Sequence, residues 1–399
     1  MNLSKVKWKN TVEKITVCAQ DCCTGCMACV DVCPKEAICI VDTITAYNAL
    51  IDGQKCIECG ACHKICQNNR YIKGQRPIFW KQGWARDDEI RKSSSSGGVA
   101  QALEISFVQS GGIVCSCLFS QGKFGFAFAD TENEVKRFSG SKYVKSNPQG
   151  IYMKIKKYLK EGKRVLFVGL PCQVAAVKSY IGTVYDNNLY TVDLICHGTP
   201  SPKILEVFLA QYNITIENLS DIQFRNNNKF AISENMKYIV PYGILDAYSM
   251  AFLNSACYTE NCYYCHYANL ERVSDITLGD SWGSQLDEKE RARGISLILC
   301  QSIKGQKMLE QTELKLIDVD LDQAIEHNHQ LKQPSTKPNI RENFFQELKK
   351  GKKFNSVVRR NYPRQSLKQL VKLILIKTKV IRGGAVADYG ISYIKKNVK

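Results

Sequence analysis

The sequence predicts an α+β module followed by a larger α/β region. Two runs of cysteines, 33 residues apart, have the spacing of iron–sulfur ligands. Further along, two largely apolar runs each end in a polar loop and a helix, as parallel strands of an α/β sheet do. We therefore expect a cysteine module at 1–75, two parts of an α/β region at 76–190 and 191–345, and a basic tail at 346–399.

The cysteine module contains two copies of one motif. Each copy has three cysteines at intervals of three residues and a fourth cysteine four residues later; the copies are Cys23, Cys26, Cys29, Cys33 and Cys56, Cys59, Cys62, Cys66. In the bacterial ferredoxin run, the fourth cysteine ligates the other cluster. We expect a ferredoxin-like module with two [4Fe–4S] clusters, the first on Cys23, Cys26, Cys29 and Cys66, and the second on Cys56, Cys59, Cys62 and Cys33.

Alternative uses of these cysteines fit the spacing less well. Zinc sites pair C-x2-C units across a longer gap, and a disulfide knot is typical of secreted chains. Pro34 follows the first copy, whereas Gln67 stands where a second proline would be. Cys22 and Cys39 are not needed by either cluster, although Cys22 is an alternative to Cys23 as a ligand.

Composition limits the classes of function. The chain has 399 residues, 19 cysteines and a net charge of +17, and it begins with a polar, basic segment. We expect no secretory signal, no spanning helix and a reducing, cytoplasmic location. The positive charge is not accompanied by a nucleic-acid-binding motif, so we expect an anionic cofactor, an acidic redox partner or an anionic membrane surface instead.

The α/β region opens with a stretch of small residues. Residues 71–92 resemble a linker, and Ser96, Gly97 and Gly98 precede a helix expected from Val99 to Val108. Small residues at a helix N-terminus expose amide groups that suit a pyrophosphate. A flexible serine/glycine linker is the alternative. A strand is expected after Gly111 and Gly112, over 113–118.

The two apolar runs are the strongest strand signals. They span 165–170 and 189–195, and the helices expected after them span 174–180 and 203–212. Ligands bind at the carboxyl ends of such strands, where Pro171, Cys172 and Cys196 lie. Either cysteine could instead be a small buried side chain. A Cys196–His197 nucleophile is disfavoured because adjacent side chains rarely face each other.

A further group of cysteines occurs late in the chain. Cys257, Cys262 and Cys265 predict a third [4Fe–4S] site, with Cys172 or Cys196 as the fourth ligand. A zinc site and a site without metal are the alternatives. A strand expected from Ser274 ends at Gly279 and Asp280, and a buried strand spans 295–300.

The tail combines basic and apolar residues. Helical spacing places apolar residues among lysines at Leu367, Leu370, Val371, Ile374 and Leu375. Such a helix can lie on an anionic membrane surface, so a membrane-peripheral location is one expectation. Docking on the protein itself or on a partner is the other.

Taken together, these motifs resemble the coenzyme F420 hydrogenase/dehydrogenase beta-subunit family, in the form with an N-terminal two-cluster ferredoxin domain. The resemblance covers about 22–330, with 76–190 and 191–345 as its two parts. It rests on the cysteine runs and on Ser96-Gly97-Gly98, Gly169 to Gln173, Cys196 to Ser201, Phe224-Arg225, the late cysteines, and Asp275 to Asp280. It implies FAD, bound near Ser96, Gly97, Gly98, Pro171, Cys172, Gly279 and Asp280, with a cluster beside it.

The resemblance implies an oxidoreductase that passes electrons between a hydride carrier, FAD and clusters. The carrier is F420-like or another donor, and the partner is a redox protein or a small electron carrier. We expect no protein nucleophile. The alternatives are an electron-relay subunit without a substrate of its own, and a reductase in cell-surface polysaccharide synthesis, which the basic tail suggests.

Overall fold

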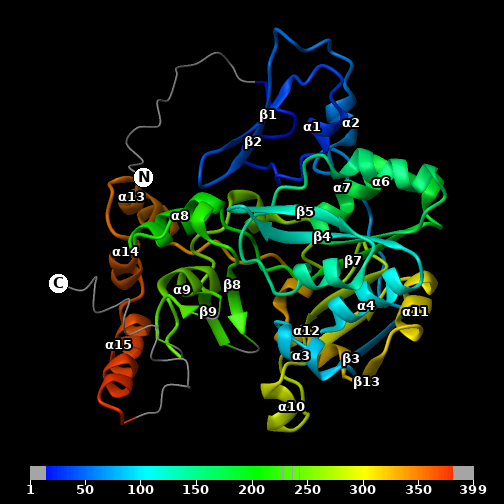
Figure 1. Cartoon of the computed structure of the whole chain (residues 1–399). Coiled ribbons are helices and arrows are strands. Elements are labelled where there is room, and N and C mark those ends of the chain that lie inside the picture. Colours follow the sequence, from blue (N-terminus) through cyan, green and yellow to red (C-terminus); the bar gives the residue numbers. More distant parts are fainter. Residues whose placement is uncertain (1–14, 227–228, 236, 242, 381–399) are drawn as a thin grey trace.

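A central eight-stranded sheet positions most of the chain (Figure 1). The computed structural model describes residues 15–226, 229–235, 237–241 and 243–380. The strand order is β13-β3-β12-β11-β7-β6-β4-β5. In chain order, the strands are β3 (Phe79–Ala85), β4 (Ile113–Ser120), β5 (Lys123–Ala129), β6 (Val165–Gly169), β7 (Leu189–Leu194), β11 (Ile276–Asp280), β12 (Ser296–Cys300) and β13 (Leu314–Ile317).

Strand directions bring several loops to one edge of this sheet. Strands β4, β6, β7 and β11 are parallel, whereas β12 is antiparallel to both β11 and β3. Strand β3 therefore points the same way as the parallel set. The carboxyl ends of β3, β6, β7 and β11 consequently meet at the same edge, where ligands of α/β proteins usually bind.

Helices cover both faces of the sheet. Alternate residues of β6 point to opposite sides, so Leu166 and Val168 contact one core and Val165 and Phe167 another. The first face is covered by α4 (Val99–Gln109) and α11 (Ile303–Glu310), and the second by α6 (Ile151–Lys160) and α7 (Pro171–Ile181). The predicted strands β4, β6 and β7 and the predicted helices α4 and α7 are confirmed within a few residues.

The prediction of a linker at 71–92 is wrong. This segment contains β3, which lies inside the sheet between β12 and β13, and α3 (Asp88–Ser93). Polar residues of β3 find partners on neighbouring strands and loops: Lys81 pairs with Asp318, and Gln82 accepts a hydrogen bond from Ser281. These partners lie far away in the sequence, so the mixed composition of the segment concealed a strand.

The cysteine module lies against α6 and α7, at the top of the molecule in Figure 1. It contains α1 (Ala28–Val32), the antiparallel pair β1 (Ile38–Asp42) and β2 (Tyr47–Ile51), and α2 (Ala61–Ile65). The two helices start 33 residues apart, which confirms the predicted repeat. After the module, Gln75 and Arg272 exchange two backbone hydrogen bonds of 2.8 and 2.9 Å, which fix the chain before it enters β3.

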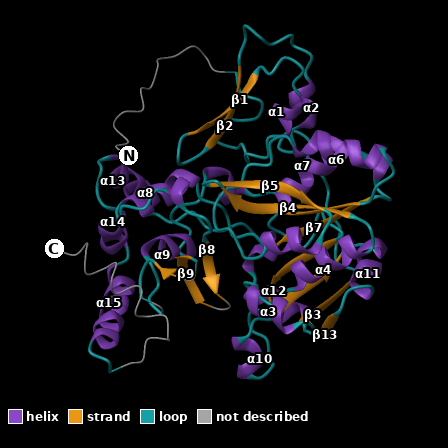
Figure 2. Cartoon of the chain, in the orientation of Figure 1, coloured by secondary structure: helices purple, strands orange, loops and turns teal. Residues whose placement is uncertain are grey.

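A second core lies beside the main sheet (Figure 2). Its elements are α8 (Pro202–Ala210), the three-stranded sheet of β8 (Gln223–Asn226), β9 (Lys229–Glu234) and β10 (Lys237–Tyr238), α9 (Ala247–Leu253), α13 (Arg341–Lys349), α14 (Phe354–Asn361) and α15 (Pro363–Lys377). Helix α15 confirms the helical spacing of the tail. The sequence also predicts a helix break at Gly383 and Gly384, which lie outside the described residues.

The remaining elements are short. They are α5 (Glu132–Val135), α10 (Glu288–Ala292), α12 (Leu321–His327), and the 3-10 helices at Lys136–Phe138, Thr183–Tyr185, Ile216–Asn218, Glu260–Tyr264 and His329–Leu331. Over the part of the chain that the structure describes, no helix has the length and apolar character needed to cross a membrane.

Candidate iron–sulfur and cofactor sites

The structure brings the first predicted ligand set around one cavity. Five thiols line it, together with Thr24, Met27 and Asn68; the cysteines are Cys18, Cys23, Cys26, Cys29 and Cys66. Four of them are the cysteines expected for the first cluster, including Cys66 from the second copy. Cys18 is the addition that sequence reasoning missed, because it belongs to no motif.

The second predicted set surrounds a separate cavity. Its thiols are Cys33, Cys56, Cys59 and Cys62, and the other lining residues include Ile38, Ile51 and Ala61. Cys33 comes from the first copy of the motif. The crossover of the fourth cysteine in each copy is therefore present in the fold. The role of these eight cysteines as cluster ligands stays a prediction.

Backbone amides point at the sulfurs in the same way in both copies. The amide of Gly25 donates to Cys23 Sγ at 3.4 Å, and the amide of Glu58 donates to Cys56 Sγ at 3.4 Å. Gly25 and Glu58 have φ values of +71° and +54°. Glu58 adopts this unfavourable left-handed conformation although it is not glycine. Hydrogen bonds to sulfur tune iron–sulfur clusters, so this geometry fits the predicted cofactor.

The spacing of the thiols also matters. Within 15–226, 229–235, 237–241 and 243–380, no group of three or more His, Cys, Asp or Glu side chains could hold a single metal ion. A cubane distributes four thiolates over four irons, so its ligands stand further apart than those of one zinc ion. Each cysteine-lined cavity contains the four thiols expected for one cubane, and the binding of iron there stays a prediction.

A third group of thiols forms where β6 and β7 end. It consists of Cys172, Cys196, Cys262 and Cys265. Burial raises the pKa of Cys172 well above its usual value, and the neighbouring thiols of Cys265, Cys196 and Cys262 raise it further. Burial likewise raises the pKa of Cys196 to about 12, beside Cys262 and Cys265. The amide of Thr199 donates to Cys262 Sγ at 3.4 Å.

Cys257 does not lie with this group. It is fully buried in the second core beside Tyr248 and Tyr258. Burial raises the pKa of its thiol, and the charged side chain that opposes this shift is Arg341. The structure thus brings together both candidates for the fourth ligand, Cys172 and Cys196, whereas Cys257 is not among the thiols that shift the pKa of either one. Its role as a ligand stays a prediction.

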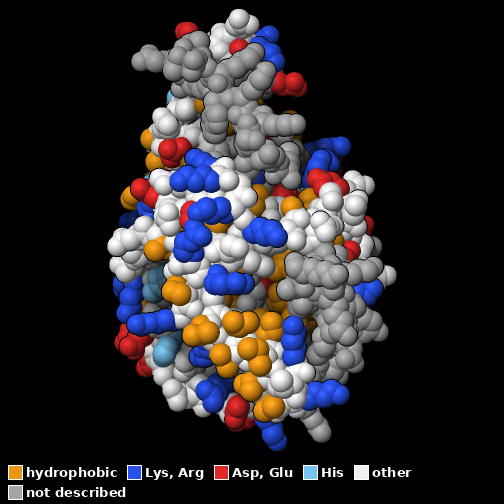
Figure 3. Space-filling model, turned by 90° about the vertical axis from the view of Figure 1, so that its left-hand side faces the viewer, with side chains coloured by type: hydrophobic (Ala, Val, Ile, Leu, Met, Phe, Trp, Pro, Cys, Tyr) orange, Lys and Arg blue, Asp and Glu red, His pale blue; other side chains and the backbone are white. Residues whose placement is uncertain are grey.

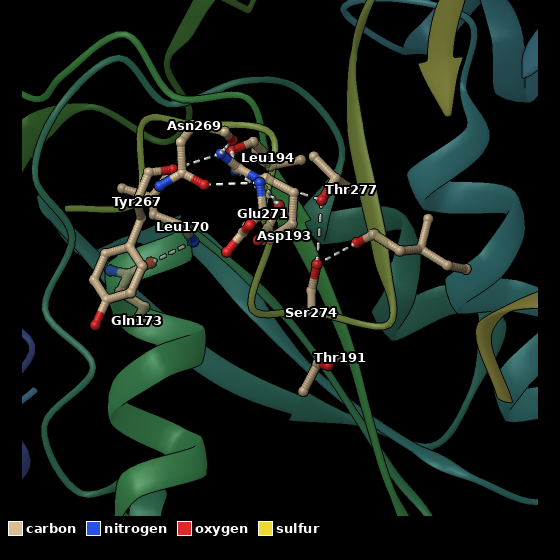
Figure 4. A network of polar contacts seen from close by, with 12 residues as sticks. Leu170, Gln173, Thr191, Asp193, Leu194, Tyr267, Asn269, Glu271, Ser274 and Thr277 are labelled. Carbon is tan, nitrogen blue, oxygen red and sulfur yellow. Dashed lines mark hydrogen bonds and ion pairs between the residues drawn. The ribbon is translucent and has the colours of Figure 1, made fainter. Parts of the chain in front are cut away.

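A buried ion pair holds the segment that carries Cys265 (Figure 4). Arg272 Nη2 lies 2.9 Å from Asp193 Oδ1, and neither side chain is more than 1% exposed. The same guanidinium donates to the backbone oxygens of Tyr267 at 2.7 Å and Leu194 at 3.0 Å. Arg272 therefore fixes the loop after Cys265 against the end of β7.

Lys145 connects the cysteine module with this third group. Its side chain donates to the backbone oxygen of Thr24, beside the first cavity, and stacks over the ring of Tyr47. Its charge also lowers the pKa of Cys172 and Cys196, against the larger effect of burial. A buried ammonium thus stands between two groups of thiols. No motif in the sequence marked this lysine.

The residues expected near FAD gather at the carboxyl edge of the sheet. Gly83, Ser296 and Asp280 lie opposite one another on β3, β12 and β11. The amide of Gly97 donates to Ser296 Oγ at 3.1 Å, and Gly98 precedes α4. Pro171 and Cys172 begin α7 at the end of β6, two strands away from β11. Their contact with a flavin stays a prediction.

Three of these positions also have clear structural roles. Asp280 accepts two hydrogen bonds from the Arg225 guanidinium, at 2.7 and 2.9 Å. At Gly279, a Cβ atom would come within 2.5 Å of Ile195 Cδ1. Gly97 is similarly confined, because a Cβ atom would lie 2.4 Å from the oxygen of Gly83. These glycines are required for packing at this edge.

Two histidines, His197 and His329, also lie at this edge of the sheet. Burial lowers the pKa of His197 to about 4, and the neighbouring His329 contributes. The side-chain amide nitrogen of Gln330 lies 2.8 Å from Nδ1 of His197 and 2.7 Å from Nε2 of His329. Neutral, hydrogen-bonded imidazoles are therefore expected here at neutral pH.

Buried charged groups that the sequence did not single out lie beside the end of β6. Burial raises the pKa of Glu104 to about 7, against the effects of a hydrogen bond with Ser116 and the charge of Lys142. Burial also lowers the pKa of Lys142, which donates to the oxygens of Phe138 and Ser139. Glu104 and Lys142 lie close enough for each to influence the pKa of the other.

The chain is similar to known proteins over much of its length. Residues 81–149 match the N-terminal model, and residues 162–320 the C-terminal model, of the coenzyme F420 hydrogenase/dehydrogenase beta subunit. An uncharacterized protein of Methanocaldococcus jannaschii is 25% identical over 197 residues, which cover 42% of this chain and 54% of that protein. The chain thus spans about half the length of this relative.

A solved structure is also similar. A chain of the F420-reducing [NiFe] hydrogenase complex from Methanosarcina barkeri aligns with a TM-score of 0.46 and 18% identity, over 66% of this chain and 97% of that one. The two segments that match the family models together cover more than half of the 399 residues. The chain belongs to the coenzyme F420 hydrogenase/dehydrogenase beta-subunit family.

Proposed function

We propose that this protein is an iron–sulfur flavoprotein that exchanges electron pairs with a hydride carrier and single electrons with a redox partner. Membership of the family indicates an oxidoreductase with a role in electron transfer. The observation that carries the finer proposal is the succession of three thiol groups, from the second cavity through the first to the group at the carboxyl edge.

One side chain supports a short path between the last two groups. Tyr152 is fully buried, and its hydroxyl donates to the backbone oxygen of Cys26. Burial raises the pKa of Tyr152 well above its usual value, and both Cys26 and Cys172 add to that shift. Cys26 of the first cavity, Tyr152 and Cys172 of the third group belong to one packed cluster, which supports a short path between the two groups.

Each group of residues has a proposed task. The eight cysteines of the module hold two [4Fe–4S] clusters, and Cys172, Cys196, Cys262 and Cys265 hold a third. FAD, when bound, takes up two electrons as hydride and releases them singly. The residues expected for it are Ser96, Gly97 and Gly98 at the start of α4, with Pro171 and Asp280 along the same edge. The neutral histidines and the buried Arg225–Asp280 pair keep this edge ordered.

The test is the cofactor content of protein purified without oxygen. We expect about twelve irons and an equal amount of sulfide, with one FAD per chain. Roughly eight irons without flavin would match two cubanes alone and would favour a relay subunit. Absence of iron would overturn the proposal.

The identity of the hydride carrier needs a separate test. An F420-like deazaflavin is the first candidate, because the family is named for coenzyme F420. Reduced deazaflavin or nicotinamide would be mixed with the protein under anaerobic conditions, and the flavin absorbance followed. Bleaching by one of them identifies the donor. If neither bleaches a flavin that dithionite reduces, a protein partner becomes the expected donor, as the relay hypothesis requires.

We also propose that α15 brings the protein to an anionic membrane surface. Leu367, Leu370, Val371 and Ile374 are each between 48% and 60% exposed and share one stretch of this helix. Figure 3 shows the apolar side chains gathered as one patch with Lys and Arg around it. On the other side, Gln365 and Gln369 hydrogen-bond to Asn254 and Leu245, so the helix is fixed with its apolar residues outward.

Vesicle sedimentation tests this contact. The full chain is expected to sediment with vesicles that contain phosphatidylserine and to stay in solution with pure phosphatidylcholine. Leu370→Ser with Ile374→Ser should abolish sedimentation. Val184→Ser, which changes another strongly exposed apolar residue, should leave it unchanged. Equal binding of both vesicle types, or of the double variant, would contradict the proposal.

A further inference from the structure

The first cavity has one thiol more than a cubane requires. Four cysteine ligands complete a [4Fe–4S] cluster, yet five cysteines line this cavity. Cys23, Cys26, Cys29 and Cys66 belong to the two motif copies, and Cys18 lies five residues before the first of them. The second cavity has only its four motif cysteines. The two otherwise similar sites therefore differ by Cys18.

Hydrogen bonds fix Cys18 in its place. The amide of Val17 donates to the oxygen of Ala49 on β2 at 2.9 Å, and Asn69 donates to the oxygen of Val17 at 2.8 Å. The side-chain amide of Asn68 lies 3.8 Å from Cys18 Sγ. The side chain of Cys18 is only 8% exposed. Both β2 and the segment after Cys66 thus hold this thiol at the cavity.

The surroundings of Cys18 set it apart from the other spare cysteines of the module. Its side chain belongs to the same buried cluster as those of Cys23, Cys29 and Cys66. By contrast, Cys22 and Cys39 are exposed and do not line the cavity. A buried thiol that lines the cavity beside the predicted ligands needs little movement to take the place of one of them.

We propose that Cys18 is a reserve ligand of the first cluster and can replace Cys23. The inference rests on the proposed function, since it requires a cluster in this cavity. In the exchange, the bond between one iron and Cys23 Sγ breaks and a bond to Cys18 Sγ forms. The proton of the Cys18 thiol passes to the released Cys23 thiolate. No electron is transferred, so the charge of the site is unchanged.

Iron content and electron paramagnetic resonance of dithionite-reduced protein test this exchange. Cys23→Ala is expected to keep the iron content of the wild type, because Cys18 binds in place of the missing ligand. The resonance of the first cluster should change in shape, as a different cysteine now ligates it. Cys18→Ala alone should keep both iron and resonance. The double variant Cys18→Ala with Cys23→Ala should lose about four irons.

The matched control is Cys23→Ala with Cys39→Ala. It removes the same number of cysteines as the first double variant but leaves Cys18, so it should keep its iron. The resonance of the second cluster, on Cys33, Cys56, Cys59 and Cys62, reports in every variant that the module is folded.

The outcomes separate the two hypotheses. A wild-type protein without iron would overturn the clusters and, with them, the reserve ligand. Clusters in the wild type, with the same iron loss in Cys23→Ala as in the double variant with Cys18→Ala, would overturn the reserve ligand alone. A Cys23→Ala variant that keeps its iron but has an unaltered resonance would also contradict it, because Cys23 would then not be a ligand.

Discussion

The Lys145 ammonium donates a hydrogen bond to the backbone oxygen of Thr24 at 3.0 Å. Thr24 lines the first cysteine cavity, and Lys145 also lies near Cys172 and Cys196 of the third thiol group. A single side chain, 5% exposed, therefore contacts the cysteine module and influences the carboxyl edge of the sheet. Its positive charge lowers the pKa of two thiols of the third group, and its ammonium lies against the lining of the first cavity.

Lys145→Met is expected to lower the reduction potential of the adjacent clusters. A reduced cluster carries one more negative charge, and a nearby ammonium stabilises that form. Removing the ammonium should lower the potential by about 60 mV, a tenfold change for one electron. Redox titration followed by electron paramagnetic resonance measures the shift. Lys157→Met, which removes an exposed lysine of α6, should have no effect; an equal shift in both variants would argue against a local influence.

Cys172→Ala and Cys196→Ala should each lower the iron content by about four. Both thiols belong to the third group, so either loss leaves an incomplete ligand set. Cys257→Ala should keep all the iron and instead lower the free energy of unfolding by about 1 to 2 kcal/mol, because it opens a small space in a packed core. Iron analysis and urea denaturation measure the two effects. Iron loss in Cys257→Ala alone would restore the ligand set that the sequence spacing predicted.

Asp280→Asn is expected to lower the free energy of unfolding by about 3 kcal/mol. The variant weakens a bidentate pair with Arg225, whose side chain is only 2% exposed. Urea denaturation provides the measurement. In Asp318→Asn, the lost pair with Lys81 is exposed, so the change should stay below about 1 kcal/mol. Similar changes in both variants would mean that burial does not strengthen the Arg225 pair.

Glu104 should make stability depend on pH. Burial raises its pKa in the folded protein from 4.5 to about 7. Between these values the folded state binds more protons than the unfolded state, so this contribution to stability is present below pH 4.5 and lost as pH rises through 7. Relative to the wild type, Glu104→Gln should gain up to about 3 kcal/mol in unfolding free energy between pH 5 and pH 8.

Urea denaturation of both proteins at the two pH values gives this difference. The variant of an exposed glutamate, Glu326→Gln, is the control, and its difference from the wild type should be the same at pH 5 and pH 8. A pH-independent difference for Glu104→Gln as well would mean that Glu104 is already ionised at pH 5 in the folded protein.

The sequence predicted those elements that are determined by residues close together in the chain. Strand β6 is apolar throughout and β7 is largely apolar because both of their faces are buried, and α4 follows Gly98, whose φ of +80° begins the helix. The two cysteine runs were equally clear, since their spacing is set by the geometry of the predicted cofactor. In each case, residues within about ten positions determine the structure.

Features that depend on distant residues were missed. Strand β3 carries Lys81 and Gln82, whose partners Asp318 and Ser281 lie about 200 residues away or more. Cys257 was grouped with its sequence neighbours, although Cys262 meets Cys172 and Cys196, which lie 90 and 66 residues earlier. Only the order of the strands in the sheet brings these thiols together. Cys18 and Lys145 could not be predicted as site residues because neither belongs to a sequence motif.

The junction between the cysteine module and the sheet has a kinetic consequence. Gln75 and Arg272 exchange two backbone hydrogen bonds just before β3 enters the sheet, and Arg272 is itself anchored by Asp193. These bonds fix the segment that connects the module to the sheet, so this segment cannot act as a flexible hinge. Any electron passage from module to sheet edge therefore proceeds across a fixed gap. The rate of this electron transfer should not depend on solvent viscosity. In electron carriers whose domains must move together before transfer, the rate does depend on it.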